Sequence, residues 1–163
     1  AKTEIYEENN SLIYKQKLLK TTKIRKLKKE DFLIVANALD YLERRRFIHG
    51  DLNKKNIIYT YDGFKIIDFE PSLYQIKNGV KQLMITIPYA VKSDLDSQNP
   101  TILTDKIGFI YFVLRVTKQM KSIDVVRLSK SLNHESYLNI KLNKISKMSY
   151  KKLVERFFNF KSI

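Results

Sequence analysis

The segment from Asp105 to Lys118 constrains the fold more than any other part of the sequence. Its spacing predicts a helix with apolar residues on nearly every side: Ile107, Phe109, Ile110, Tyr111, Phe112, Val113, Leu114 and Val116. A helix that is apolar all round must be enclosed by other elements, so we expect it at the centre of a domain. A chain of 163 residues, 44% of them hydrophobic, is long enough to supply those elements as one domain.

Further helices are predicted on both sides of this central segment. The first covers about residues 31–45, where apolar residues recur every three or four positions and Asp31 can cap the beginning of the helix. Two more are expected near residues 122–132 and 149–160. Helices therefore account for most of the regular structure that the sequence predicts.

Two β-hairpins are predicted as well. Residues 3–19 contain two β-prone runs around Asn9-Asn10, and residues 56–67 contain two more around Asp62-Gly63, a pair that favours a tight turn. Residues 70–104 form an irregular segment with prolines and polar residues, and a loop of that length is usually functional. The expected fold class is α+β, mostly α.

The charge of the chain points to an anionic partner. There are 31 Lys and Arg against 17 Asp and Glu, a formal net charge of +14, and the basic residues are concentrated in 15–29 and after Arg115.

Cysteine is absent and only two histidines occur, which excludes disulfides, thiolate metal sites and a cysteine nucleophile. No secretory signal and no run long enough to cross a bilayer is visible, so we expect a soluble, cytoplasmic protein without a membrane span.

One stretch, residues 47–70, places polar side chains at a spacing suited to phosphate chemistry. An apolar anchor leads to Asp51 in a tight turn, Asn56 follows five residues later, and a short hairpin leads to a second acid, Asp68. Carboxylate and amide oxygens suit Mg²⁺, which also binds phosphate oxygens. A carboxylate that holds no metal can accept a proton from an incoming hydroxyl. The set fits metal-assisted phosphoryl transfer, which depends mostly on positioning and charge neutralisation.

Two motifs of this stretch resemble the protein-kinase-like superfamily. The first, His49-Gly50-Asp51-Leu52-Asn53-Lys54-Lys55-Asn56, is similar to the catalytic-loop pattern H-R-D-L-x-x-x-N with Gly in place of Arg. The second, Asp68-Phe69-Glu70, is similar to the D-F-G metal loop with Glu in place of Gly. The helices expected on either side also resemble those that flank the two motifs in a kinase C-lobe. The resemblance covers about residues 3–118 and is to an atypical or minimal Ser/Thr kinase.

The resemblance implies a role for each polar position of the site. Asp51 would be the catalytic base, and Asn56 and Asp68 would hold Mg²⁺ and, with it, the nucleotide. His49 would anchor the loop in the core, and Asp105 would brace the loop backbone. The implied cofactors are ATP and Mg²⁺, and the implied reaction transfers a phosphoryl group to a hydroxyl of a protein.

Most of a kinase N-lobe is missing from the chain. Its glycines are Gly50, Gly63, Gly79 and Gly108, so none precedes the catalytic loop and no G-x-G-x-x-G phosphate loop exists. We therefore expect one kinase-like domain over residues 1–163. Residues 1–28 would be the remnant of an N-lobe hairpin and hinge, and residues 29–163 would be the C-lobe.

Several interpretations stay open at this stage. Another subunit carrying an N-lobe could complete the ATP site, the chain could grip nucleotide from the C-lobe side alone, or it could be a catalytically inactive pseudokinase that binds a partner or an acidic protein. Asn53 stands where Ser/Thr kinases have a Lys, which leaves a small-molecule or lipopolysaccharide-sugar kinase as a further alternative. Ala90-Val91-Lys92 replaces the A-P-E that ends an activation segment, so its usual acidic anchor is missing. A nucleic-acid-binding role is the least favoured, because no RNA-binding motif is present.

Overall fold

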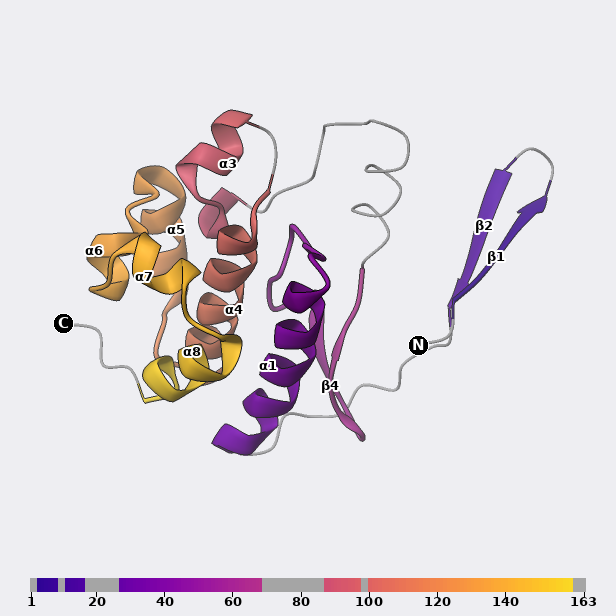
Figure 1. Ribbon diagram of the computed structural model, residues 1–163, viewed down its shortest axis with the longest axis horizontal. Helices are drawn as coiled ribbons and strands as arrows, with labels where there is room; N and C mark the ends of the chain where they lie inside the picture. Colours follow the sequence, from indigo (N-terminus) through magenta and orange to yellow (C-terminus); the bar gives the residue numbers. More distant parts are fainter. Residues whose placement is uncertain (1–2, 9–10, 17–26, 69–86, 98–99, 160–163) are drawn as a thin grey trace.

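The computed structural model describes residues 3–8, 11–16, 27–68, 87–97 and 100–159 (Figure 1). These residues form an α+β protein that is mostly helical, which confirms the predicted fold class. The elements are β1 (Thr3–Glu8), β2 (Ser11–Gln16), α1 (Lys29–Arg44), β3 (Ile57–Thr60), β4 (Gly63–Ile66), the 3₁₀ helix η1 (Ile87–Tyr89), α3 (Lys92–Ser97), α4 (Ile102–Val116), α5 (Ser122–Ser131), α6 (His134–Leu138), α7 (Leu142–Ser146) and α8 (Tyr150–Phe157).

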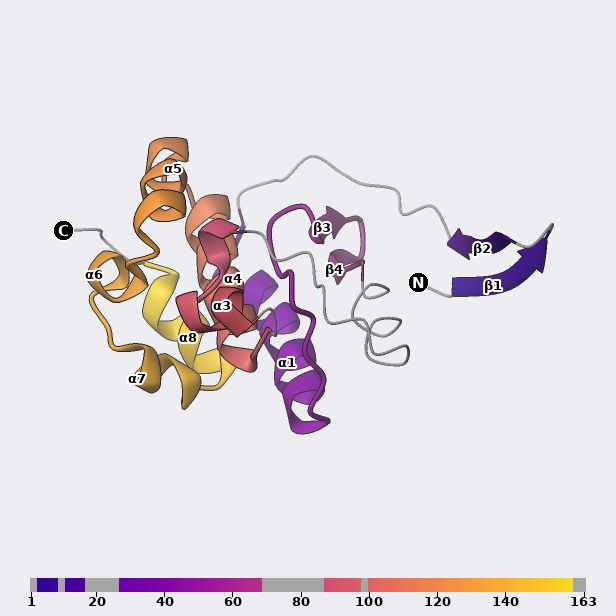
Figure 2. The same cartoon turned by 90° about the horizontal axis from the view of Figure 1, so that it is seen from above.

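Helix α4 is the centre of the fold, as its apolar sequence predicts. Every residue from Thr104 to Leu114 is buried. Thr101 begins the helix because its side chain accepts a hydrogen bond from the Leu103 backbone N–H at 3.3 Å. Helices α7 and α8 and the short η1 pack directly on α4, while α1 lies alongside in both views (Figures 1 and 2).

Helix α1 packs against α8 and strand β4 through one apolar face. Its buried residues are Phe32, Val35, Ala36 and Leu39, close to the predicted periodicity. The helix begins two residues earlier than predicted, at Lys29. Asp31 does stabilise this end, but from the third helical position, where its carboxylate accepts from the Lys28 backbone N–H at 2.8 Å.

Both predicted hairpins are present as antiparallel strand pairs. Strand β1 pairs with β2 from Thr3↔Gln16 to Glu8↔Ser11, and the Asn9-Asn10 turn lies outside the described residues. In the second hairpin Thr60 pairs with Gly63, so the turn residues are Tyr61 and Asp62, one position earlier than predicted. Gly63 begins β4 with a φ of +94°, which a residue without a Cβ adopts readily.

The second hairpin joins the core through an aromatic cluster. The ring of Phe64 on β4 lies 5.5 Å from Phe32 of α1 and 5.2 Å from Phe112 of α4. Aromatic pairs at such distances add to the free energy gained from burial. The cluster holds the hairpin against α1 and α4. The residue after β4, Ile67, then lies beside His49.

The C-terminal part of the chain contains the two predicted helices and further short ones. The helices expected near 122–132 and 149–160 are confirmed as α5 and α8. The short α3, α6 and α7 were not predicted, and α3 and η1 fall inside the segment 70–104 that was expected to be irregular. Helices of five or six residues have little intrinsic stability, so their positions depend on tertiary contacts that a sequence pattern does not contain.

Within the described part of the chain, none of the helices combines the length and apolar character needed to span a bilayer.

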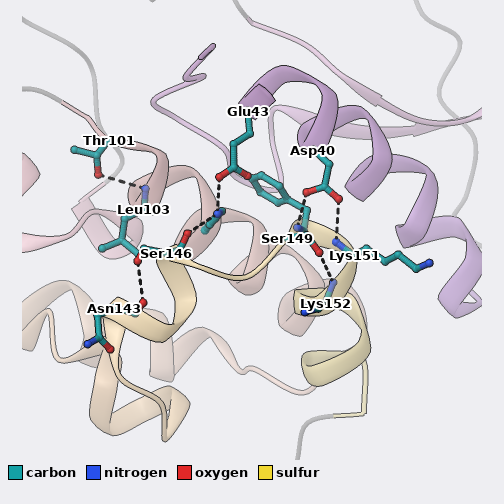
Figure 3. Close-up of polar contacts among 11 residues, drawn as sticks. Asp40, Glu43, Thr101, Leu103, Asn143, Ser146, Ser149, Lys151 and Lys152 are labelled. Carbon is teal, nitrogen blue, oxygen red and sulfur yellow. Dashed lines mark hydrogen bonds and ion pairs between the residues drawn. The ribbon is translucent and has the colours of Figure 1, made fainter. Parts of the chain in front are cut away.

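A half-buried ion pair and a hydrogen bond, both made by Lys106, join α1, α4 and α7. Lys106 is 1% exposed, and its Nζ donates to Glu43 Oε1 of α1 at 2.7 Å and to the Ser146 carbonyl of α7 at 2.8 Å. Figure 3 shows Glu43 and Ser146 converging on this ammonium group.

In the same view Asp40 of α1 caps α8, where it accepts from the Tyr150 backbone N–H at 2.7 Å.

We expect Glu43→Ala to destabilise the protein by about 2 kcal/mol, because it leaves the buried Lys106 ammonium without a carboxylate, with the Ser146 carbonyl and the face of the Tyr150 ring as its partners. Urea denaturation followed by circular dichroism measures the change. The matched control is Lys141→Ala, which breaks the exposed Lys141–Glu135 pair at 3.0 Å. The control should change the free energy of unfolding much less, since exposed pairs contribute little. Equal losses in the two variants would contradict the prediction.

Candidate active site

The loop after α1 is fixed to α4 by the Asp105 carboxylate. Asp105 is 2% exposed and accepts two backbone hydrogen bonds, from the N–H of His49 at 2.7 Å and from the N–H of Gly50 at 2.8 Å. These bonds fix the backbone immediately before Asp51. Gly50 has a φ of +83°, so the chain turns sharply here in a conformation that glycine adopts at little cost. Asp105 was predicted to brace this loop, and the geometry agrees with that role.

The loop also lies directly on the surface of α4 one turn further along the helix. At Gly108 an added Cβ would overlap the carbonyl oxygen of Leu52. Leu52 itself is 1% exposed. The absence of a side chain at Gly108 therefore lets the loop approach the helix closely, and Asp105 and Gly108 together form the platform on which the loop rests.

His49 connects the loop to the end of β4. Its Nε2 lies 2.9 Å from the Ile67 carbonyl oxygen, which can only accept, and its Nδ1 lies 3.4 Å from the Asp51 backbone N–H, which can only donate. The ring is therefore neutral, with its proton on Nε2. Burial lowers the pKa of His49, which keeps this form stable although Asp51 and Asp68 both act to raise it. One imidazole thus joins the two acidic segments of the site.

Asn56 and Asn53 hold the loop around Asp51. The Asn56 side-chain amide donates to the Asp51 carbonyl at 2.9 Å and to Asp51 Oδ2 at 3.0 Å. Asn53 donates to the same carbonyl at 3.2 Å, and its own oxygen accepts from the Lys55 N–H at 2.8 Å. Both asparagines are buried. Asn53 therefore stabilises the loop through its own side chain.

Asp68 follows β4 in a left-handed backbone conformation, with a φ of +66°. Such a conformation is uncommon for a residue with a side chain, although Asp and Asn tolerate it best. The preceding residue, Ile67, is held from both sides: its N–H donates to the Asn56 carbonyl at 2.9 Å and its carbonyl accepts from His49. Asp68 is therefore exposed, and its backbone lies beside the loop that carries Asp51. The other two residues of its motif, Phe69 and Glu70, lie outside the described residues.

The donor set fits a hard divalent cation bound together with phosphate. The NH₂ group of Asn56 faces Asp51, which leaves the amide oxygen as the end suited to a metal. Asp68 is exposed and follows Ile67, whose N–H donates to the Asn56 carbonyl. Among the described residues no three His, Asp or Glu side chains gather as a metal cluster. A cation held by Asn56 and Asp68 would draw its other ligands from phosphate oxygens and water, as Mg²⁺ commonly does.

Sequence reasoning missed the residue that anchors the segment after the site. His134 of α6 is 1% exposed; its Nε2 donates to the Ala90 carbonyl at 2.6 Å and its Nδ1 accepts from the Tyr111 hydroxyl of α4 at 2.8 Å. Ala90 stands at the start of the triplet that lacks the usual acidic anchor. A histidine 44 residues later in the chain fixes this position instead. The one signal for His134 in the sequence was its rarity, since just two histidines occur.

Tyr89 of η1 also lies within electrostatic reach of the site. Its ring packs against Tyr111, with centroids 5.7 Å apart. Burial raises the pKa of Tyr89; Arg115 opposes this rise and the negative charge of Asp51 adds to it. The end of the segment 87–91 is therefore within electrostatic reach of the proposed base.

Comparison with models of protein families and with curated proteins finds no match for this chain. The case for a function therefore depends on the residues of the site and on the motifs that they form.

We expect Gly108→Ala to loosen the loop, because its methyl group cannot share space with the Leu52 carbonyl. The free energy of unfolding should fall by about 2 kcal/mol, and the Gly50 N–H should exchange with solvent faster. Hydrogen exchange followed by NMR measures the second effect. Gly63→Ala is the control: its added Cβ meets nothing within 4 Å, so it should strain the hairpin without changing exchange at Gly50. Unchanged exchange in Gly108→Ala would show that the loop does not rest on α4.

We expect the stability of the protein to depend on pH through Asp105. Burial raises the pKa of Asp105 from 3.8 to about 7, against the opposing effect of the His49 and Gly50 N–H groups; Asp51 and Asp94 raise it further. The folded state therefore binds a proton at Asp105 more tightly than the unfolded state does. Its favourable contribution is complete below about pH 4 and is lost as the pH rises through 7.

This dependence is measured by urea denaturation of the wild type and of Asp105→Asn between pH 5 and 8. Relative to the variant, the wild type should lose on the order of 3 kcal/mol as the pH rises. Parallel pH profiles for the two proteins would refute the assignment to Asp105.

Proposed function

We propose that the protein is an ATP- and Mg²⁺-dependent phosphotransferase of the protein-kinase-like type that phosphorylates a hydroxyl group of a protein. One observation supports the proposal: His49, in the loop held by Asp105, bonds the carbonyl of Ile67, the residue before Asp68, and Asn56 bonds Asp51 directly. Asp51, Asn56 and Asp68 stand at the catalytic and metal positions of the two motifs.

In this proposal Asp51 accepts the proton of the substrate hydroxyl. Its carboxylate is oriented by the Asn56 amide at 3.0 Å, and its backbone is fixed by Asp105 through the two preceding N–H groups. Asn56 and Asp68 would hold Mg²⁺, which when bound neutralises charge on the phosphates of ATP. The chain's own contribution is therefore to position the base and the metal ligands relative to each other.

The nucleotide needs contacts beyond the described site. No glycine-rich loop precedes His49 in the sequence, so we propose that another subunit carrying an N-lobe covers the phosphates. The net charge of +14 would favour both the nucleotide and an acidic partner protein.

We expect the chain, alone or with its partner subunit, to bind ATP in a Mg²⁺-dependent manner, which isothermal titration calorimetry measures. Asp68→Asn should remove the Mg²⁺ dependence because it removes the anionic metal ligand. The control is Asp62→Asn, which neutralises an exposed aspartate in the β3–β4 turn and should bind as the wild type does. If neither the chain nor its complex binds MgATP, the proposal fails.

Phosphotransfer tests the role of Asp51 separately. Asp51→Asn keeps the shape of the side chain but removes the proton acceptor, so kcat should fall by about 10²- to 10⁴-fold while ATP binding persists. Transfer from radiolabelled ATP to protein measures this change. Binding of MgATP without any transfer by the wild type would instead favour a pseudokinase, and full activity of Asp51→Asn would show that another group is the base.

A further inference from the structure

An open hollow of about 510 Å³ lies between α6, α7 and α8. Both views place α6 and α7 on the far side of α4 from the β3–β4 hairpin (Figures 1 and 2), and the lining includes no residue of the proposed active site. The hollow is within the usual size range of small-molecule sites. Its lining residues are Asn133, Glu135, Ser136, Asn139, Ile140, Lys141, Lys144 and Arg156.

The charges of this lining do not balance. Lys141, Lys144 and Arg156 contribute three cations, and Glu135 is the one acid among the lining residues. The Glu135 carboxylate is already engaged, because Oε2 accepts from Lys141 Nζ at 3.0 Å and Oε1 accepts from the Leu142 N–H at 2.8 Å. Among the described residues, neither Lys144 nor Arg156 forms an ion pair with a carboxylate. Two cations of the lining, Lys144 and Arg156, are therefore not compensated by a carboxylate of the described residues.

The neutral part of the lining is also suited to an anion. Asn133 Oδ1 accepts from the Ser136 N–H at 3.1 Å, so the amide NH₂ is the end of this side chain left for a ligand. The hydroxyl of Ser136 and the side-chain amide of Asn139 add further donors to the wall. Ile140 is the single aliphatic residue of the lining. Such a wall offers mainly cations and hydrogen-bond donors.

The frame that carries these groups is part of the core. Lys144 precedes Ile145 and Arg156 precedes Phe157, and both apolar neighbours are fully buried. The two cations come from different helices, α7 and α8, so their separation is set by the packing of the helices and not by local sequence. Fixed backbone positions reduce the conformational entropy that two cations lose when they bind one anion, compared with two lysines on a flexible tail.

A second hollow, of about 360 Å³, has a different balance of charge. It is lined by residues of α1, α4 and the segment before α8, with Asp40, Glu43 and Lys106 among them. There the acids are used within the protein: Glu43 pairs with Lys106 and Asp40 caps α8 (Figure 3). The second hollow has two acids for its three cations, Arg44, Lys106 and Lys147, whereas the hollow between α6, α7 and α8 has the single acid Glu135 for three cations.

We propose that the hollow between α6, α7 and α8 is a binding site for a small organic phosphate. A phosphate ester matches the wall best, because its oxygens accept several hydrogen bonds from cations and donors at once. Arg156 provides the planar guanidinium that binds phosphate with two parallel hydrogen bonds, and Lys144 provides a point charge. The site is separate from the proposed catalytic centre and does not depend on it.

The test is calorimetric titration of the full chain with fructose 1,6-bisphosphate as the probe, with EDTA present so that metal-dependent binding does not contribute. The variant Lys144→Ala/Arg156→Ala should weaken binding by about tenfold or more, as expected for the loss of two charge-assisted contacts. The matched control is Lys151→Ala/Lys152→Ala, which removes the same charge from exposed positions of α8 that do not line the hollow. The control should retain the affinity of the wild type within about twofold.

Citrate is the second probe, because it is a trianion without phosphate. We expect it to bind at least tenfold more weakly than the bisphosphate. The proposal is overturned if the bisphosphate does not bind, if the two double variants lose affinity equally, or if citrate binds as well as the bisphosphate. The altered side chains are exposed, and thermal unfolding of each variant checks that it is folded.

Discussion

The candidate site depends on one buried interaction, the pair of hydrogen bonds that Asp105 accepts from His49 and Gly50. A carboxylate in the core is costly, and burial raises its pKa to about 7. Two short bonds to backbone N–H groups offset part of that cost. Because α4 is enclosed on all sides, the carboxylate occupies a fixed position, and the loop that binds it acquires the same rigidity. Asp51 is placed by this backbone contact before any substrate is present.

His49 extends that fixed frame to the second half of the site. Its ring accepts from the Asp51 N–H and donates to the Ile67 carbonyl, so the loop and the end of β4 move together. Asn56 adds a parallel link, through its side chain to Asp51 and its carbonyl to Ile67. The backbone that leads to Asp68 is thereby held next to the loop that carries Asp51. Sites of this kind suit a bound cation, which would compensate the charge.

The charge of the chain has more than one use in the structure. Lys106 is buried and joins three helices, so it contributes to packing. Lys144 and Arg156 face an open hollow, where their charge is not compensated by the described residues. The composition alone could not separate these uses, because it records how many cations exist and not where the fold places them. The same holds for His134, a histidine whose contacts with Ala90 and Tyr111 anchor the segment after the site.

The sequence by itself determined the central helix, the helix before the loop, both hairpins and the polar positions of residues 49–68, because each follows from periodicity, turn chemistry or motif spacing. It did not determine the short helices α3, α6 and α7, the turn at Tyr61-Asp62, or the roles of Gly108, His134 and Asn53. These depend on contacts between residues far apart in the chain, such as Gly108 with Leu52 and His134 with Ala90. Only tertiary structure decides them, because a local pattern specifies which face of an element is apolar but not which backbone atoms will meet it.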